Sequence, residues 1–449
     1  MANPAQRLAV CFDGTWNTDR SNTNVSRLFR KVADETCGCL EQKRFYDDGV
    51  GTRWGERIRG GVLGMGLDRN IRQAYAWLGV QYPTVLPAEL GSAGFVQGPQ
   101  LFLIGFSRGA FTARSLGGLI NYLGLPKSAS LPNTDPTVPL EEHPLVQEAW
   151  SLYVARPTPD ERKQIAANKA TGALRDRVKD QDAKADAYRK QKAVYPVRIH
   201  FLGVWDTVGA LGIPRVLDYS WLPRPSNQYL FHDTQLGRCV RFGYHAAAID
   251  EQRENYCVTL WTGKDPNTTE EVEQRWFPGA HADVGGGYED DLLPDPPLAW
   301  IAQKAAEKGL HFVNDRGLVD PQTEQVPCSV ARPPAAFDLD GREYLSPVHD
   351  SYAEFMYGLY RVLRAIPGAG GRVYRRMLVG KDGIGQSVDP TAYKKLEADA
   401  SYRPPNLAQA GREDVSYHIA TLDNGEGAEA ARSPADGTSG EGSDHVRPA

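Results

Sequence analysis

Ser107 lies between two glycines in a pattern that indicates nucleophilic catalysis. Residues 105–109 read Gly-Phe-Ser-Arg-Gly and fit the nucleophile-elbow pattern Gly-x-Ser-x-Gly. An elbow needs a buried strand before it and a helix after it, and residues 101–104 and 110–120 have the required apolar run and helical spacing. Glycines are expected there because flanking side chains would collide with the strand or the helix. We therefore predict Ser107 as the nucleophile; the alternative is a serine in an ordinary tight turn.

Asp206 and His281 are the predicted partners of this serine. A serine hydroxyl attacks only when a base takes its proton and a carboxylate orients that base. In hydrolases with this elbow the chain order is serine, acid, histidine, with both partners after later strands. Asp206 ends the β-rich segment 197–205, and His281 precedes three successive glycines at 285–287. We predict Asp206 as the acid and His281 as the base.

Structural roles remain the alternatives for both partners. Asp206 could be a turn carboxylate, and His281 could be a packed turn histidine. Other histidines could supply the base, but none combines a strand end with glycine-rich surroundings; they are His245, His311 and His418.

An oxyanion hole would complete the site. One donor is expected to be the backbone N–H of Arg108, the residue after the nucleophile. The second is expected from Asp13-Gly14-Thr15, which follows the apolar run 8–12. Gly14 would let the backbone approach a ligand, and Asp13 would orient the turn. The alternative is an Asx-type turn with no part in catalysis.

The Asp-Gly-Thr segment also permits other chemistry. It is typical of phosphotransferases with an aspartyl nucleophile, but those enzymes place a second Asp two residues earlier, where this chain has Cys11. A metal site could combine Asp13 with His281 and Asp283, although nothing in their spacing demands it. We expect no metal ion and no cofactor.

Strand, turn and helix patterns alternate along the first part of the chain. This alternation predicts an α/β fold with a mostly parallel sheet flanked by helices. We expect a catalytic core over residues 1–290, in which 126–193 form a charged helical insertion that is either a lid or a solvated face. Residues 291–423 are expected to pack on the core. The tail, 424–449, has the composition of a disordered segment.

Composition narrows the class of partner. The chain has 449 residues with 51 Lys and Arg against 56 Asp and Glu, so its net charge of −5 argues against nucleic acid. No window is apolar enough to span a membrane, and no secretory signal is evident at the N-terminus. We expect a cytoplasmic protein, or one exported without a signal peptide. The six cysteines are sparse, and Cys37-Gly-Cys39 has the wrong spacing for a zinc half-site.

Four motifs together resemble a known family. They are FDGTWN at 12–17, GFSRGAFTAR at 105–114, GVWDTVG at 203–209 and WFPGAHADVGGGY at 276–288. The chain resembles, over residues 5–365, the α/β-hydrolase family long labelled a domain of unknown function. Its best-understood members are family-one phospholipase effectors of type VI secretion. The resemblance implies Ser107 as nucleophile, Asp206 as acid and His281 as base, acting on lipid esters, with an immunity or secretion partner if the protein is an effector.

The expected function is therefore carboxylic-ester hydrolysis through an acyl-enzyme, on a phospholipid or another acyl lipid. The chain is compact beside the large effectors, which leaves the effector role open. Residues 352–366 have amphipathic helical spacing, with Arg372, Arg375 and Arg376 nearby; they could form a peripheral membrane contact or a helix that covers the sheet. The alternatives are a hydrolase of small esters unconnected with membranes and a non-catalytic binding protein of the same fold.

Overall fold

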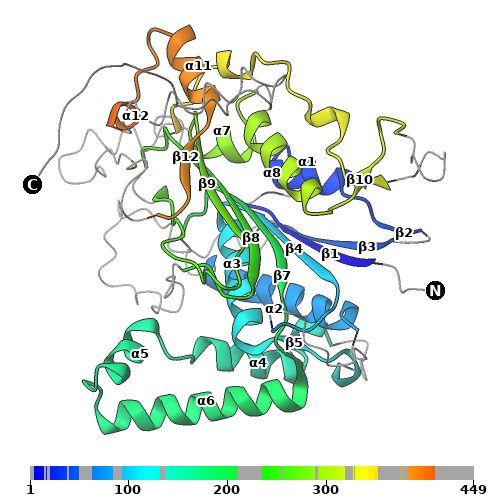
Figure 1. The fold of residues 1–449 in the computed structure, drawn as a ribbon, viewed down its shortest axis with the longest axis vertical. Coiled ribbons are helices and arrows are strands. Elements are labelled where there is room, and N and C mark those ends of the chain that lie inside the picture. The colour runs from blue at the N-terminus through cyan, green and yellow to red at the C-terminus, as the bar shows by residue number, and fades with distance from the viewer. Residues whose placement is uncertain are drawn as a thin grey trace, which may run out of the picture.

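The computed structural model has a central β-sheet between two layers of helices (Figure 1). The residues that it describes are 5–14, 17, 21–37, 40–49, 63–83, 94–131, 138–209, 235–253, 256–288, 292–318, 327, 329–351, 376 and 383–409. Several residues discussed above lie outside these described ranges. They are Thr15, Cys39, Arg372, Arg375, His418, the stretch 352–366 and the tail 424–449.

The central sheet has eight strands among the described residues, in the order β12-β9-β8-β7-β4-β1-β3-β2. All neighbouring strands run parallel except β2, which is antiparallel to β3. This arrangement confirms the predicted α/β-hydrolase-like class. The strands are β1 (Ala5–Phe12), β2 (Glu35–Cys37), β3 (Leu40–Asp47), β4 (Gln100–Phe106), β7 (Ile199–Trp205), β8 (Val240–Ala248), β9 (Glu271–Phe277) and β12 (Gln386–Val388).

Helices cover both faces of the sheet because its central strands are apolar on both sides. In β1, Val10 and Phe12 join the core under α2 (Leu63–Gln81) and α3 (Arg108–Leu123), whereas Ala9 and Cys11 join the core on the opposite face. That opposite face is covered by α1 (Asn24–Lys31) and α8 (Asp295–Glu307) (Figure 1). The turn between β4 and α3, which carries Ser107, therefore rests on a core packed from both sides.

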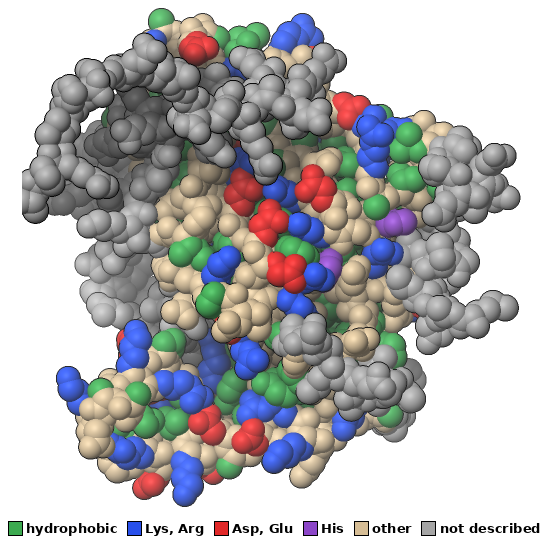
Figure 2. Space-filling model, in the orientation of Figure 1, with side chains coloured by type: hydrophobic (Ala, Val, Ile, Leu, Met, Phe, Trp, Pro, Cys, Tyr) green, Lys and Arg blue, Asp and Glu red, His purple; other side chains and the backbone are tan. Residues whose placement is uncertain are grey.

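A helical insertion separates α3 from β7. It contains α4 (Pro144–Val154), α5 (Pro159–Ala166) and α6 (Gly172–Lys192), and the short pair β5 (Leu125–Pro126) and β6 (Ala193–Val194) closes its base. Positive and negative side chains are interspersed over this part of the surface (Figure 2), as the mixed-sign charge pattern predicts. Residues of α6 that are buried are Val178, Gln181, Ala185 and Tyr188.

Further helices follow β9 and β12. The helix α7 (His281–Gly285) follows β9, while α11 (Pro390–Ala398) and α12 (Pro405–Gln409) follow β12.

Two short strands, β10 (Phe312–Val313) and β11 (Ser329–Val330), pair with each other. Single 3-10 turns lie at Ser128–Ser130, Leu140–Glu142, Ala335–Phe337 and Glu343–Leu345. No helix within the described ranges is both long and apolar enough to cross a membrane.

Candidate active site

The carboxyl ends of three parallel strands bring the predicted catalytic residues together. Ser107 follows β4, Asp206 follows β7, and His281 begins α7 just after β9. The strands β4 and β7 are neighbours, and β8 separates β7 from β9. Ligands of open α/β sheets bind at this edge because the loops that leave parallel strands all meet there.

Ser107 has the strained backbone of a nucleophile elbow. Its φ is 57° and its ψ is −120°, in a region that non-glycine residues seldom occupy. Its N–H donates to the carbonyl of Trp205 at 3.0 Å, which ties the elbow to the adjacent strand. A Cβ at Gly105 would lie 2.5 Å from the Gly109 carbonyl oxygen, and one at Gly109 would lie 2.2 Å from the Phe12 carbonyl oxygen. The two glycines therefore permit the close approach of strand, turn and helix.

Ser107, His281 and Asp206 form a continuous hydrogen-bonded chain. The Nε2 atom of His281 lies 2.8 Å from the Ser107 Oγ, and its Nδ1 atom lies 2.5 Å from Asp206 Oδ2. The side chains are buried, with 6%, 6% and 0% exposure for Ser107, His281 and Asp206. The ring of His281 packs between Phe106 and Tyr256, with centroid distances of 4.7 and 4.9 Å. The arrangement can transfer a proton from the serine to the imidazole.

Arg376 is a residue of this site whose role the sequence did not reveal. It was grouped with Arg372 and Arg375 in a basic cluster that could face a membrane, but it is only 1% exposed. Its Nη1 donates to Asp206 Oδ1 at 2.5 Å, and its Nη2 donates to Asp206 Oδ2 at 3.0 Å. Only its place in a basic cluster could have drawn attention to it, and that signal is typical of surfaces.

The charges of the site favour an ionised acid and a neutral base. Burial alone would raise the pKa of Asp206, but the charge of Arg376 and the hydrogen bond from His281 outweigh it and hold the pKa well below its usual range. Burial lowers the pKa of His281, although its hydrogen bond to Asp206 opposes that shift. At neutral pH His281 can therefore accept the proton of Ser107.

The segment predicted to supply an oxyanion donor lies against the elbow. A Cβ at Gly109 would also lie 2.5 Å from the Asp13 carbonyl oxygen, so this turn contacts the start of α3. The Asp13 carboxylate accepts hydrogen bonds at 2.6 Å from the hydroxyls of Thr23 and Tyr46 and from the N–H of Gly14. Burial raises the pKa of Asp13 to about 6, against these hydrogen bonds. The Gly14 N–H is thus engaged with Asp13 in this state.

The side chain of Arg108 does not use all of its hydrogen-bond donors within the described residues. Its Nη1 nitrogen is buried and has no hydrogen-bond partner within the described part of the chain. Burial lowers the pKa of Arg108, and Tyr256, whose ring lies against His281, opposes that shift. A guanidinium stays charged in proteins, so a cation with unused hydrogen-bonding capacity follows the nucleophile.

The other candidate residues have structural partners. His245 accepts a hydrogen bond from the Thr207 N–H through Nε2, and burial lowers its pKa to about 3. Asp283 pairs with Nδ1 of His349 at 2.6 Å and accepts the Ala280 N–H at 2.8 Å. His311 lies beside Ser329. Across the described ranges, no group of three or more His, Cys, Asp or Glu side chains is arranged to hold a metal ion.

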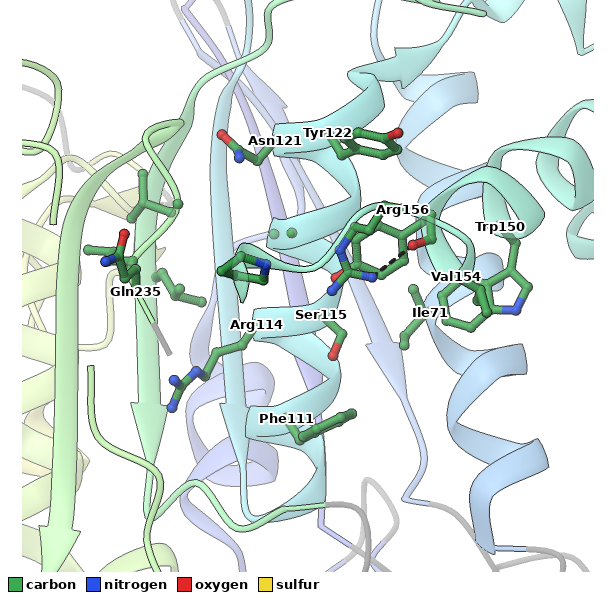
Figure 3. Close-up of a pocket in the computed structure, with 18 of the residues that line it drawn as sticks. Ile71, Phe111, Arg114, Ser115, Asn121, Tyr122, Trp150, Val154, Arg156 and Gln235 are labelled. Atoms are coloured by element: carbon green, nitrogen blue, oxygen red, sulfur yellow. Dashed lines mark hydrogen bonds between the residues drawn. The ribbon is translucent and has the colours of Figure 1, made fainter. Parts of the chain in front are cut away.

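A cavity of about 350 Å³ extends along α3 on the side of the insertion. It begins at Phe111, one helical turn after Ser107, and passes Ser115 and Tyr122 (Figure 3). Trp150 and Arg156 approach it from the insertion, and Gln235 lies on the opposite side. None of the three triad side chains lines this cavity.

Comparison with known proteins places the chain in a family. A model described as "T6SS, Phospholipase effector Tle1-like, catalytic domain" matches residues 6–304. The uncharacterized protein YEL023C of Saccharomyces cerevisiae is 25% identical over 279 residues, which are 58% of this chain but only 33% of that protein.

Two solved structures are also similar. The Tle1 effector bound to the VgrG spike of the type 6 secretion system is 15% identical, with a TM-score of 0.31, over 64% of this chain and 52% of that one. An uncharacterized protein from Pseudomonas aeruginosa is 17% identical, with a TM-score of 0.36, over 69% of this chain and 46% of that one. The family match spans well over half of the chain and confirms the resemblance seen in the four motifs. The chain belongs to the family of Tle1-like phospholipase effector catalytic domains.

Proposed function

We propose that the protein is a serine hydrolase that cleaves the carboxylic esters of phospholipids or other acyl lipids. The observation that carries this proposal is the hydrogen-bonded chain from Ser107 through His281 to Asp206, with Ser107 in a strained elbow. A binding module has no need of such a strained serine, so the non-catalytic alternative is disfavoured. The family to which the chain belongs supports a lipid substrate.

The reaction would proceed in two halves. His281 takes the proton of Ser107 through Nε2 as the serine oxygen attacks the ester carbonyl, and Asp206 stabilises the resulting imidazolium. The N–H of Arg108, at the start of α3, is the first oxyanion donor. The second would come from the segment 13–15 after the Gly14 N–H turns away from the Asp13 carboxylate. His281 then gives its proton to the departing alcohol, which leaves an acyl-enzyme. A water deprotonated by His281 hydrolyses that acyl-enzyme and restores Ser107.

The cation at Arg108 supports a substrate with a negative charge. A phosphodiester lies only a few bonds from the acyl esters of a phospholipid, and a guanidinium binds phosphate oxygens through paired hydrogen bonds. A neutral small ester would leave the buried Nη1 atom unsatisfied. This observation favours phospholipid over a small-ester hydrolase. Contact with a membrane surface, and an immunity or secretion partner, are further parts of the proposal; no cofactor is needed.

Labelling with a fluorophosphonate probe tests the nucleophile. We expect the wild type to label and to hydrolyse p-nitrophenyl esters, whereas Ser107→Ala should not label and should lose at least about 10³-fold in kcat. A serine hydroxyl without an adjacent base should not react, so Ser115→Ala, at a buried position further along α3, is a suitable control. Equal labelling of the wild type and Ser107→Ala would rule out Ser107 as the nucleophile.

A further inference from the structure

Arg376 reaches the catalytic acid from beyond the matched family domain, which ends at residue 304. We propose that Arg376 is a positioning residue that holds the Asp206 carboxylate in line with His281 and offsets its charge. The C-terminal region would then complete an active site whose three triad residues all lie within the family domain. This inference rests on the proposed function for its catalytic consequence, and on the contacts of Asp206 for its structural basis.

The contacts of Asp206 show what the arginine fixes. The fork of Arg376 spans both carboxylate oxygens, at 2.5 Å to Oδ1 and 3.0 Å to Oδ2. The Oδ2 atom is also hydrogen-bonded to Nδ1 of His281. The Oδ1 atom also accepts a hydrogen bond from the N–H of Ala248 at 2.9 Å. A carboxylate held by one partner can rotate about its Cβ–Cγ bond, but a planar fork bound to both oxygens opposes that rotation. Arg376, together with the N–H of Ala248, therefore sets the direction of the bond to His281.

The same guanidinium also connects two loops of the site. Its Nη1 donates to the Ala248 carbonyl at 2.8 Å, and its Nη2 donates to the Tyr256 carbonyl at 2.5 Å. Ala248 ends β8, and the ring of Tyr256 packs edge-on against His281. A lysine at this position would keep the charge but could not reproduce the four contacts, because its ammonium lacks the planar fork.

The charge of Arg376 should also affect the base. The charged groups that face His281 are Asp206, Glu251 and Arg253, and Arg376 acts through Asp206. With Arg376 present, the negative charge of Asp206 is shared between two cations when His281 is protonated. Without it, Asp206 would favour the imidazolium more strongly, so the pKa of His281 would rise. Since only neutral His281 can take the serine proton, activity would then be lost at a higher pH as the solution is acidified.

The test compares Arg376→Gln, Arg376→Lys and the wild type in the rate of fluorophosphonate labelling across pH. We expect Arg376→Gln to lower the plateau rate about 10- to 100-fold and to move the acidic midpoint up by about one pH unit. Arg376→Lys should keep the wild-type midpoint with a reduced plateau. Arg403→Gln is the matched control, because within the described residues Arg403 donates to nearby backbone carbonyls alone, those of Leu396, Asp399 and Tyr402. A wild-type plateau and midpoint in Arg376→Gln would overturn the proposal.

A second measurement separates this inference from the proposed function. In the Ser107→Ala background, NMR titration of the His281 imidazole needs no activity, and Arg376→Gln should raise its pKa while Arg403→Gln should not. If the wild type neither labels nor hydrolyses esters, the proposed function fails, and the titration still decides the role of Arg376. If Arg376→Gln does not fold, Arg376→Lys decides: a reduced plateau supports the fork, and a wild-type plateau contradicts it.

Discussion

At the residue scale, Ser107 and Arg108 have separate proposed roles: Ser107 is the nucleophile, and the Arg108 side chain binds the charge of the substrate. Ser107 is held by the backbone, with its N–H on the Trp205 carbonyl and its hydroxyl on His281. Arg108 offers its backbone N–H at the start of α3 and a side chain whose Nη1 atom has no partner in the described residues. Reactivity and substrate charge can therefore be tested by separate substitutions.

The first prediction concerns the substrate charge at Arg108. In Arg108→Gln we expect kcat/KM for a short-chain phospholipid, such as dihexanoylphosphatidylglycerol, to fall about 10- to 100-fold, because one charge-assisted contact to phosphate is worth about 1.5–3 kcal/mol. The loss for neutral dihexanoylglycerol should be less than about 3-fold, since that ester has no phosphate to bind. Steady-state assays below the micelle concentration measure both.

The labelling rate is the control for this prediction. The fluorophosphonate labelling rate of Arg108→Gln should remain near that of the wild type, because the backbone N–H is unchanged. An equal loss of activity on the phospholipid and on the neutral glyceride would instead show that Arg108 maintains the elbow and does not recognise charge.

The helical insertion illustrates what holds an element to the fold. Its surface ion pairs, such as that between Arg162 and Asp182, are about half-exposed, with 48% and 39% of the side chains accessible. Such pairs contribute little, because solvent screens them and ordering long side chains costs entropy. By contrast, Tyr188 of α6 is 1% exposed and joins the core that contains α2 and α3. We infer that apolar burial, rather than charge, anchors the insertion.

The second prediction tests this anchor. Tyr188→Ala should lower the free energy of unfolding by about 3–5 kcal/mol, as deletion of a buried aromatic ring does. Arg162→Ala should change it by no more than about 1 kcal/mol. Urea unfolding followed by circular dichroism gives both values. A larger loss for Arg162→Ala than for Tyr188→Ala would show that the ion pairs, and not the buried ring, are the main attachment.

At the scale of the whole molecule, the C-terminal region is bound to the loops around His281. The Ser351 hydroxyl donates to Glu251, which in turn accepts the N–H of His281 at 3.2 Å. The hydroxyl of Tyr402 donates to Asp250, and His349 pairs with Asp283. These buried acids would lose partners if the region were absent, and an uncompensated buried charge is costly.

The third prediction is that a chain ending at Asp338 will not form a working site, although it contains the whole matched family domain. Removal of one partner from a buried ion pair costs about 3–5 kcal/mol, and this truncation removes Arg376 from Asp206. It also removes the hydrogen bond between His349 and Asp283. We expect labelling to fall at least about 100-fold and the melting temperature to drop. A truncated chain that labelled at the wild-type rate would show that the C-terminal region is dispensable for catalysis.

Two strands of the sheet, β3 and β8, do not stand out in the sequence as apolar runs. The apolar runs of β1 and β4 stand out, but β3 reads Leu-Glu-Gln-Lys-Arg-Phe-Tyr-Asp and β8 ends in three alanines. Charged side chains interrupt β3, and β8 alternates Val240, Phe242 and Tyr244 with other residues before its alanines, so neither is a continuous apolar run. Both become strands because they pair between neighbours on either side, which supply the hydrogen bonds and the burial. Tertiary context overrides local preference in such central positions.

The sequence by itself determined the elbow, the fold class and the family, because each is encoded in short motifs with local patterns around them. It also predicted Ser107, Asp206 and His281, which the tertiary structure places in one hydrogen-bonded chain. Only the tertiary structure decided that Arg376 binds Asp206, from 170 positions further along the chain. A basic cluster looks the same in sequence whether it faces solvent or enters a core. What distinguishes the two is a buried counter-charge, and that partner is brought near only when the whole chain folds.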